Sequence, residues 1–267
     1  MDSELAAYRR STGWLGRHLA FYASVGSTND VAIAAVQSGA DHGLVVIAEA
    51  QSAGRGRLDR RWVADAGTSL LVSMVFRPPA PVAAYAGRVP MACGLGLHAA
   101  ITDATGLDLK LKWPNDLIAE DTGRDLGWLK LAGMLGEVVS DARGEPEALV
   151  VGIGINVNVP TTRLAEVAPN AGSLAGLLDR QLDRVALLDG VLVAMEREYD
   201  ALVAGCDPLS RWRDCLAWLG RRVTVVRGTT RLVGVAEDVD QDGSLLLRAA
   251  DGVRHKLGAG DVSLRLD

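Results

Sequence analysis

The residues best suited to chemistry lie between positions 54 and 61, where the chain reads GRGRLDRR. Four arginines and two glycines fall within these eight residues, in a protein whose formal net charge is −5. Guanidinium groups match phosphate or carboxylate oxygens in two-point hydrogen bonds, and glycines let backbone N–H groups approach a ligand closely. Arg55 and Arg57 are spaced to flank one such group from both sides. A solvated charged loop is the alternative, but the length of this loop and Trp62 at its end favour an anion clamp.

Lys112 is the second candidate. Of the 28 basic residues only four are lysines, so a lysine inside a motif stands out in this chain. The segment LKLKWPND alternates, which places Lys110 and Lys112 on one face of a strand that ends at a turn. An exposed strand lysine is the better interpretation of Lys110. An ammonium group at the strand end can neutralise a carboxylate and a phosphate brought together, so we expect Lys112 to be functional.

The segment GIGINVNV at 152–159 has two different faces. Its odd positions are apolar and predict a core face, whereas its even positions are Gly152, Gly154, Asn156 and Asn158. A planar ligand can lie against such a strip of bare backbone, and an amide can bind the ligand's edge, a phosphate or a metal-bound water. Two glycines that receive a packed helix are the alternative. The strand continues through Val157, so this is not a dinucleotide-binding turn.

Ser27-Thr28-Asn29 precede an apolar run of small residues, which predicts an N-cap and a helix ending near Gly39. A plain cap is the favoured interpretation, although a helix N-terminus can also hold polar ligand atoms. Runs rich in β-branched residues at 44–50 and 68–76 predict buried strands, joined by the arginine segment. Residues 83–105 are typical of a helix.

The second half of the chain changes character near Leu219. Before it, alternation predicts strands at KLAGMLGEVV and at 149–159, a polar turn-like stretch at 119–128, and mainly helices from about 173 to 218. After it, short strands separated by glycine-containing turns predict a small barrel. The sequence therefore predicts a domain of residues 1–218 and a second of residues 219–267.

Composition excludes several classes of protein. An apolar content of 49% and a charged content of 23% over 267 residues are typical of one or two globular domains. The pI near 5.4 argues against a protein that binds nucleic acid or an anionic membrane. Neither a signal peptide nor a membrane span is predicted. Three cysteines without a CxxC pair suit a reducing cytoplasm, and the four scattered histidines predict no protein-only metal site.

Taken in order, STN, QSAGRGRLDRRW, KWPND, KLAGMLGE and GIGINVNV strongly resemble the motifs of biotin protein ligases. The resemblance covers nearly the whole chain. It implies an α+β fold in which residues 1–218 form a catalytic core like that of class II aminoacyl-tRNA synthetases, with a mixed sheet flanked by helices. Residues 219–267 would form a C-terminal SH3-like β-barrel.

The resemblance also implies the reaction. The carboxylate of biotin, the substrate, attacks the α-phosphate of ATP, which carries Mg²⁺, and this gives biotinyl-5′-AMP and pyrophosphate. A lysine of the biotin carboxyl carrier domain of an acyl-CoA or pyruvate carboxylase then takes the biotin. The expected protein is a cytoplasmic monomer or weak homodimer with no nucleic-acid or membrane partner.

The resemblance assigns catalytic roles to Arg55, Arg57 and Lys112, at the junction of carboxylate and phosphate. The residues it implies for biotin are Ser27, Thr28, Asn29, Gln51, Arg55, Gly56, Arg57, Lys112 and Gly133. The residues it implies for ATP and the adenylate are Arg55, Arg57, Trp62, Lys112, Lys130, Gly152, Gly154 and Asn156.

Two features depart from the family pattern. Leu58-Asp59 stand where GRGRxGRxW has x-Gly, so we expect the second half of the loop, from Leu58 to Arg61, to differ in how it folds over the adenylate. About 20 residues precede the STN region, too few for the winged helix-turn-helix of bifunctional members, so we expect the ligase-only type without operator binding.

Two other functions stay open. A lipoate or octanoate ligase shares the fold, but the chain lacks the RRxxGGG-type segment of those relatives. A non-catalytic regulator that binds biotinyl-AMP is the other alternative, and the retention of Lys112 with both clamp arginines argues against it.

Overall fold

The computed structural model describes residues 4–58, 60–121, 127–227, 229–259 and 262–266. Its larger sheet has seven strands in the order β1-β2-β3-β7-β6-β5-β4. Only β1 and β2 pair in parallel, and the other neighbours are antiparallel. The strands are β1 (His18–Tyr22), β2 (Leu44–Ala48), β3 (Ser69–Phe76), β4 (Leu109–Lys112), β5 (Asp116–Glu120), β6 (Trp128–Ser140) and β7 (Pro146–Asn156).

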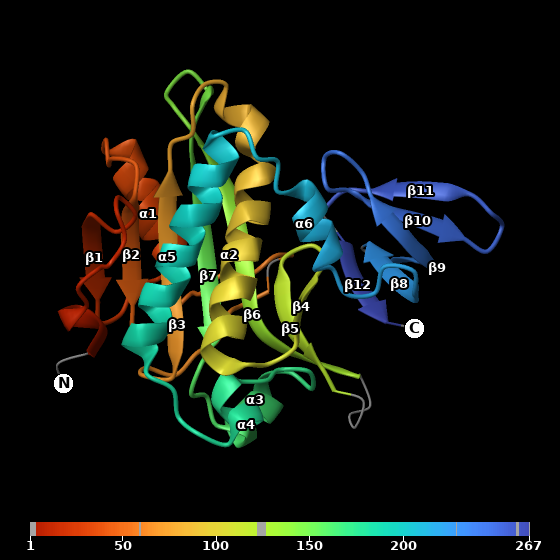
Figure 1. Ribbon diagram of the computed structural model, residues 1–267, viewed down its shortest axis with the longest axis horizontal. Coiled ribbons are helices and arrows are strands. Elements are labelled where there is room, and N and C mark those ends of the chain that lie inside the picture. Colours follow the sequence, from red (N-terminus) through yellow and green to blue (C-terminus); the bar gives the residue numbers. More distant parts are fainter. Residues whose placement is uncertain (1–3, 59, 122–126, 228, 260–261, 267) are drawn as a thin grey trace.

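Helices cover both faces of this sheet (Figure 1). α1 (Thr28–Gln37) packs on one face, where small apolar residues such as Ala32 and Val36 meet Val46, Val75 and Val150. The long helices α2 (Arg88–Thr105) and α5 (Arg184–Val203) lie side by side over the other face. The shorter elements are η1 (Glu4–Ala7), η2 (Val82–Tyr85), α3 (Thr161–Val167), α4 (Leu174–Leu178) and α6 (Leu209–Asp214).

Burial on two faces explains why the central strands are apolar throughout. All eight residues of β3, SLLVSMVF, are buried, because helices cover both of its faces. β7 alternates instead: Val151, Ile153 and Ile155 enter the core, and the glycines between them lie on the opposite face. The predicted strands and the mixed sheet flanked by helices are confirmed.

Three local details differ from the sequence predictions. The stretch expected to be turn-like, 119–128, is shorter at both ends, because β5 extends to Glu120 and β6 begins at Trp128, and its middle, 122–126, lies outside the described residues. The strand expected over 149–159 ends at Asn156. The helix α3 was not predicted, since its seven residues carry too short a pattern to be recognised.

The second sheet is antiparallel, with the order β11-β10-β9-β8-β12. Its strands are β8 (Arg222–Arg227), β9 (Thr230–Val239), β10 (Leu245–Ala249), β11 (Arg254–Leu257) and β12 (Val262–Leu266). Among the described residues β11 and β12 are the outer strands, so the C-terminal strands form an open sheet here. The division between residues 218 and 219 into two folding units stays a prediction.

The two sheets share one apolar core. Val223 and Leu247 of the second sheet belong to the same buried cluster as Trp113 and Trp212. In the described part of the chain, no helix is long and apolar enough to cross a membrane.

Candidate functional site

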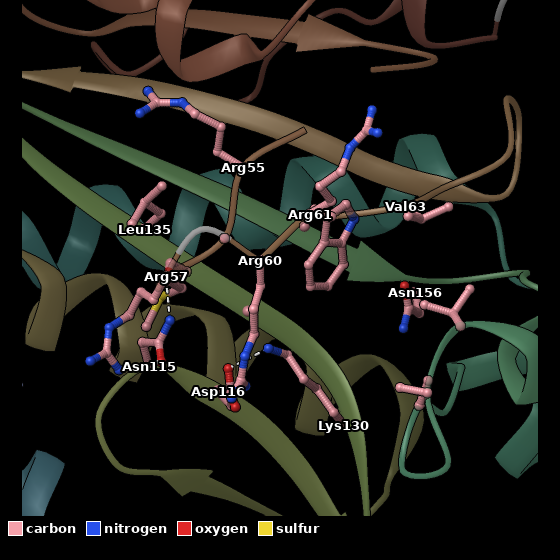
Figure 2. A pocket seen from close by; sticks show the side chains of 18 of the residues that line it. Arg55, Arg57, Arg60, Arg61, Val63, Asn115, Asp116, Lys130, Leu135 and Asn156 are labelled. Atoms are coloured by element: carbon pink, nitrogen blue, oxygen red, sulfur yellow. Dashed lines mark hydrogen bonds and ion pairs between the residues drawn. The ribbon is translucent and has the colours of Figure 1, made fainter. Parts of the chain in front are cut away.

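A cavity of about 950 Å³ opens over β6 and β7, between the arginine segment, the turn after β4 and the segment 164–171. Every residue that the sequence predicted for the site lines this one cavity, and Figure 2 shows it from close by. These residues are Ser27, Thr28, Asn29, Gln51, Arg55, Gly56, Arg57, Trp62, Lys112, Lys130, Gly133, Gly152, Gly154 and Asn156.

The arginine segment folds back on itself over the cavity. The backbone N–H of Gly56 donates to the carbonyl of Arg60 at 2.7 Å, and that of Trp62 donates to the carbonyl of Gly54 at 2.9 Å. A Cβ at Gly54 would lie 2.5 Å from the carbonyl oxygen of Trp62, so only glycine fits at position 54. Leu58 has a φ of 57°, which favours glycine. Asp59, the other half of the predicted departure, lies outside the described residues.

The two clamp arginines have different partners. Arg55 forms a two-point hydrogen bond to Glu137 at 3.0 and 2.8 Å and also pairs with Asp30 at 2.7 Å. Arg57 donates to the side-chain oxygen of Asn115 at 3.2 Å. Figure 2 shows their guanidinium groups pointing apart. In this structure they therefore do not flank one group, because the two carboxylates attract Arg55 to the side of the cavity.

Lys112 lies at the centre of the polar floor with Asp116 and Lys130. Asp116 faces Lys112 directly across the turn between β4 and β5. Its carboxylate lies 2.6 Å from the Lys130 Nζ and 3.6 Å from the Lys112 Nζ. Only 7% of the Lys112 side chain and 12% of the Asp116 side chain are exposed. One buried carboxylate is thus shared by two ammonium groups.

Burial and charge act in opposite directions on this pair. Burial lowers the pKa of Lys112 below its ordinary value, although Asp116 opposes the shift. Burial alone would raise the pKa of Asp116, but the ammonium groups of Lys130 and Lys112 more than offset this and hold that pKa below its usual range. The carboxylate therefore stays ionised, and it holds the two cations where a second anion could meet them.

The start of α1 is held by hydrogen bonds among buried polar groups. Ser27 occupies the N-cap position, but its side chain makes no capping hydrogen bond. The backbone N–H of Thr28 donates instead to the Gln51 side-chain oxygen at 2.8 Å. The hydroxyl of Ser73 in β3 donates to the Asn29 side-chain oxygen at 2.6 Å, and its oxygen lies 2.8 Å from the Thr28 hydroxyl oxygen. Ser73 thus fixes this corner, a role that its place in an apolar run did not reveal.

The glycine strip of β7 is covered by the protein's own side chains. A Cβ at Gly152 would lie 2.0 Å from the Asn29 Oδ1, and one at Gly154 would lie 2.3 Å from the Trp62 ring. The Nε1 of Trp62 is buried without a hydrogen-bond partner among the described residues. Asn156 donates to the Gly172 carbonyl at 2.9 Å. In this structure the planar group on the strip is the Trp62 indole, and the binding of a planar ligand there stays a prediction.

A Gly152→Ala variant is expected to lose about 1–3 kcal/mol of the free energy of unfolding, because the added methyl overlaps Asn29 within a fixed hydrogen-bond network. Urea unfolding measures this loss. Gly190→Ala is the matched control: this exposed glycine within α5 has open space where a Cβ would stand, so alanine should stabilise by about 0.5–1 kcal/mol. Equal stability of Gly152→Ala and the wild type would contradict the packing described.

Several residues at the cavity were not predicted. Asn115 and Asp116 belong to the KWPND motif, and Asp116 could have been found because a tight turn places it opposite Lys112. Glu137, the partner of Arg55, is the last residue of the KLAGMLGE motif, but it was not assigned a role there. Part of the remaining unpredicted lining comes from α3 and the residues after it, namely Leu164, Val167, Ala168, Pro169, Asn170 and Ala171.

Comparison with known proteins gives two family matches. A model described as "Biotin/lipoate A/B protein ligase family" matches residues 22–156, and one described as "Biotin protein ligase C terminal domain" matches residues 218–265. A biotin–[acetyl-CoA-carboxylase] ligase of Mycobacterium tuberculosis is 35% identical and covers 94% of this chain and 90% of its own length. A bifunctional ligase/repressor of Bacillus subtilis is 28% identical over 94% of this chain and 75% of its own length.

Solved structures show the same fold. The biotin protein ligase from Aquifex aeolicus in complex with biotin and ATP matches with a TM-score of 0.75 and 24% identity, covering 94% of this chain and 100% of its own. This likeness extends over both sheets.

Proposed function

Because this chain belongs to the biotin/lipoate A/B protein ligase family, we propose that its cavity binds biotin and ATP side by side. The protein is a biotin–[acetyl-CoA-carboxylase] ligase, which activates biotin as biotinyl-5′-AMP and transfers it to a lysine of a biotin carboxyl carrier domain. The observation that carries the site assignment is the cluster of Lys112, Asp116 and Lys130 on the floor of the cavity that all the predicted residues line.

Biotin is placed at the end of the cavity beside α1. There Ser27, Thr28, Asn29 and Gln51 offer neutral donors and acceptors, which suit the ureido ring of biotin. The network from Ser73 keeps these groups in position before the ligand arrives. Gly56 and Gly133 leave room along the path toward Lys112.

The adenylate is placed over β6 and β7. Gly152, Gly154 and Asn156 face it from the strand, and Lys130 stands at the side. The Trp62 indole now covers Gly154, so ATP binding requires Trp62 to move from the strip and to stack on the adenine instead.

The chemical difficulty is the approach of an anionic carboxylate to an anionic triphosphate. Lys112 and Arg57 stand where the two anions meet and reduce their repulsion, and Arg55 joins them when the ligands draw it from Glu137. Fixed cations in a buried site stabilise charge that develops in the transition state without first having to reorganise. The biotin carboxylate attacks the α-phosphorus and pyrophosphate leaves, which gives biotinyl-5′-AMP. The amine of the acceptor lysine then attacks the acyl carbon of this mixed anhydride, so that an amide forms and AMP leaves.

Mg²⁺ is proposed to arrive with the nucleotide. Among the described residues that line the cavity, Asp116 is the one carboxylate, and two lysines already hold it. Such a residue is a poor ligand for a hard cation. The triphosphate itself therefore supplies the oxygens for Mg²⁺, and no protein-only metal site is proposed.

The partners are proposed in the same way. The acceptor is the biotin carboxyl carrier domain of acetyl-CoA carboxylase, and we extend this to other acyl-CoA carboxylases and to pyruvate carboxylase. The protein is proposed to act in the cytoplasm as a monomer or weak homodimer, without a nucleic-acid or membrane partner. The boundary between the catalytic domain, 1–218, and the C-terminal domain, 219–267, is proposed to lie just before Leu219.

Exchange of pyrophosphate into ATP tests the substrate. With purified protein, biotin is expected to support exchange at least ~10-fold better than lipoate or octanoate, since a ureido ring can use the polar groups around Thr28 that an alkyl chain leaves unpaired. Exchange that depends on lipoate or octanoate would assign the protein to the other branch of the family. Absence of exchange with all three acids would favour the non-catalytic binder of biotinyl-AMP.

A further inference from the structure

Two tryptophans enclose the ammonium group of Lys112. Its Nζ lies 5.1 Å from the ring centre of Trp128 and 5.5 Å from that of Trp218. The two indoles meet edge to face at 5.5 Å, with an angle of 71° between their planes. Both are buried, with exposures of 9% for Trp128 and 3% for Trp218. A cation over an aromatic face is attracted by the ring's negative face, and the attraction grows when water is excluded.

Trp218 reaches this position through the segment that precedes it. Residues 215–217 run beside β4: the Leu111 N–H donates to the Cys215 carbonyl at 2.9 Å, and the Ala217 N–H donates to the Leu111 carbonyl at 2.7 Å. This pairing places Trp218 beside Lys112, the last residue of β4. Trp218 has a φ of 71°, a conformation that a bulky side chain adopts only when its surroundings impose it.

The C-terminal sheet imposes that conformation. The Gly220 N–H donates to the Ala236 carbonyl at 2.7 Å, and the Ala236 N–H donates to the Arg221 carbonyl at 3.0 Å, so the residues just after Trp218 are tied to β9. The turn between β9 and β10 makes a second contact, since Trp113 Nε1 donates to the Gly243 carbonyl at 3.0 Å. The C-terminal sheet therefore contacts Trp113, the residue after Lys112, and also holds the backbone that follows Trp218.

We propose that Trp218 is a positioning residue for Lys112, and that the C-terminal domain completes the site of biotin activation by holding Trp218 in place through the residues that follow it. Trp218 and Trp128 form a wall that holds the ammonium group at the strand end, where the carboxylate and the α-phosphate meet. The inference rests on the proposed role of Lys112. It gives the C-terminal domain a task in the first half of the reaction.

The wall also affects protonation. The charged groups that act on the Lys112 ammonium are Asp116, Lys130 and Arg57, and the ring centres of the two indoles lie 5.1 and 5.5 Å from its Nζ. The aromatic faces favour the ammonium form. Replacing Trp218 with leucine removes one of them, so the pKa of Lys112 should fall further below its ordinary value. Because catalysis needs the ammonium form of Lys112, the variant should lose adenylation activity at a lower pH than the wild type as the pH is raised.

The test measures biotin-dependent ATP–pyrophosphate exchange against pH for Trp218→Leu and Trp218→Phe. We expect Trp218→Leu to lower kcat about 10-fold or more, while KM for biotin stays within about 3-fold of the wild-type value. The alkaline limb of the pH–rate profile, where activity falls as pH rises, should move to lower pH. Trp218→Phe keeps an aromatic face and should restore the position of the limb. Trp212→Leu is the control: it removes another buried tryptophan, in α6, and should lower the thermal stability without moving the limb.

Each outcome decides the matter. A normal alkaline limb and normal kcat in Trp218→Leu would overturn the proposal, as would a Trp218→Phe variant as impaired as Trp218→Leu. If Trp218→Leu does not fold, Trp128→Leu takes its place, and an unmoved limb in that variant would overturn the proposal. A wild-type protein without exchange would refute the proposed function instead, so the two failures can be told apart.

Discussion

Replacing Lys112 with methionine is expected to lower the rate of biotin adenylation at least ~100-fold, which corresponds to the removal of one preorganised stabilising group from the transition state. Methionine keeps the length and apolar stem of the side chain, so its contacts with Trp128 and Trp218 remain. The lost ammonium is the group that lets a carboxylate approach the α-phosphate. Pyrophosphate release in the presence of saturating biotin and ATP measures the effect.

Lys110 supplies the matched control. It lies two residues earlier on the same strand, its side chain is 44% exposed, and its partner is Asp108 at 3.7 Å. Lys110→Met should keep at least about half of the activity, because an exposed pair of this kind contributes little. Lys112→Met should stay folded, since Asp116 keeps Lys130 at 2.6 Å. Near-normal turnover in Lys112→Met would remove this residue from the mechanism.

The contrast between the two lysines shows how far the sequence could lead. Alternation placed Lys110 and Lys112 on the same face and predicted the strand correctly. It could not predict that only 7% of the Lys112 side chain would be exposed against 44% of Lys110. Trp128 and Trp218 enclose the ammonium group of Lys112, and the contact with Trp218 joins positions about a hundred residues apart. Periodicity describes a strand's own faces and is silent about what packs on them.

The candidate site likewise contains residues that the sequence predicted and residues that it did not. The residues of the motifs line one cavity. Each motif lies at or near the end of a strand or helix that the apolar pattern had predicted. The groups that hold those residues were missed. Ser73 is a polar residue within a buried apolar strand, and Glu137 ends the KLAGMLGE motif, whose sequence alone did not show that Arg55 would bind it. Their roles exist only once the strands are paired.

Asp116→Asn is expected to lower the free energy of unfolding by about 3–5 kcal/mol at pH 7, because it leaves buried ammonium groups without their shared counter-charge. The amide is nearly the same size, so the loss reflects charge rather than a cavity. Chemical unfolding of the variant and the wild type measures it. An equally stable Asn variant would mean that water, not Asp116, compensates the two lysines.

The dependence on pH has a definite sign. The pKa of Asp116 in the folded protein lies below its ordinary value, so this carboxylate stabilises the fold above the pKa of the unfolded chain. That contribution disappears as the pH falls through the lower, folded pKa. The difference in stability between the wild type and Asp116→Asn should therefore be constant from pH 5 to 7 and shrink below about pH 4. A difference that grows toward acid would contradict the assignment.

A second substitution separates charge from packing. In Asp116→Asn the Lys112 ammonium remains deep in the site, whereas in Asp116→Asn with Lys112→Met that charge is gone and Lys130, whose side chain is 30% exposed, can turn to water. The double variant should therefore recover at least about 1–2 kcal/mol over Asp116→Asn alone, as expected when apolar groups replace a buried ion pair. A double variant no more stable than Asp116→Asn would show that the unpaired Lys112 ammonium is not what destabilises Asp116→Asn. If the double variant recovers stability but not adenylation, the charges of Asp116 and Lys112 are needed for the reaction although they lower the stability of the fold.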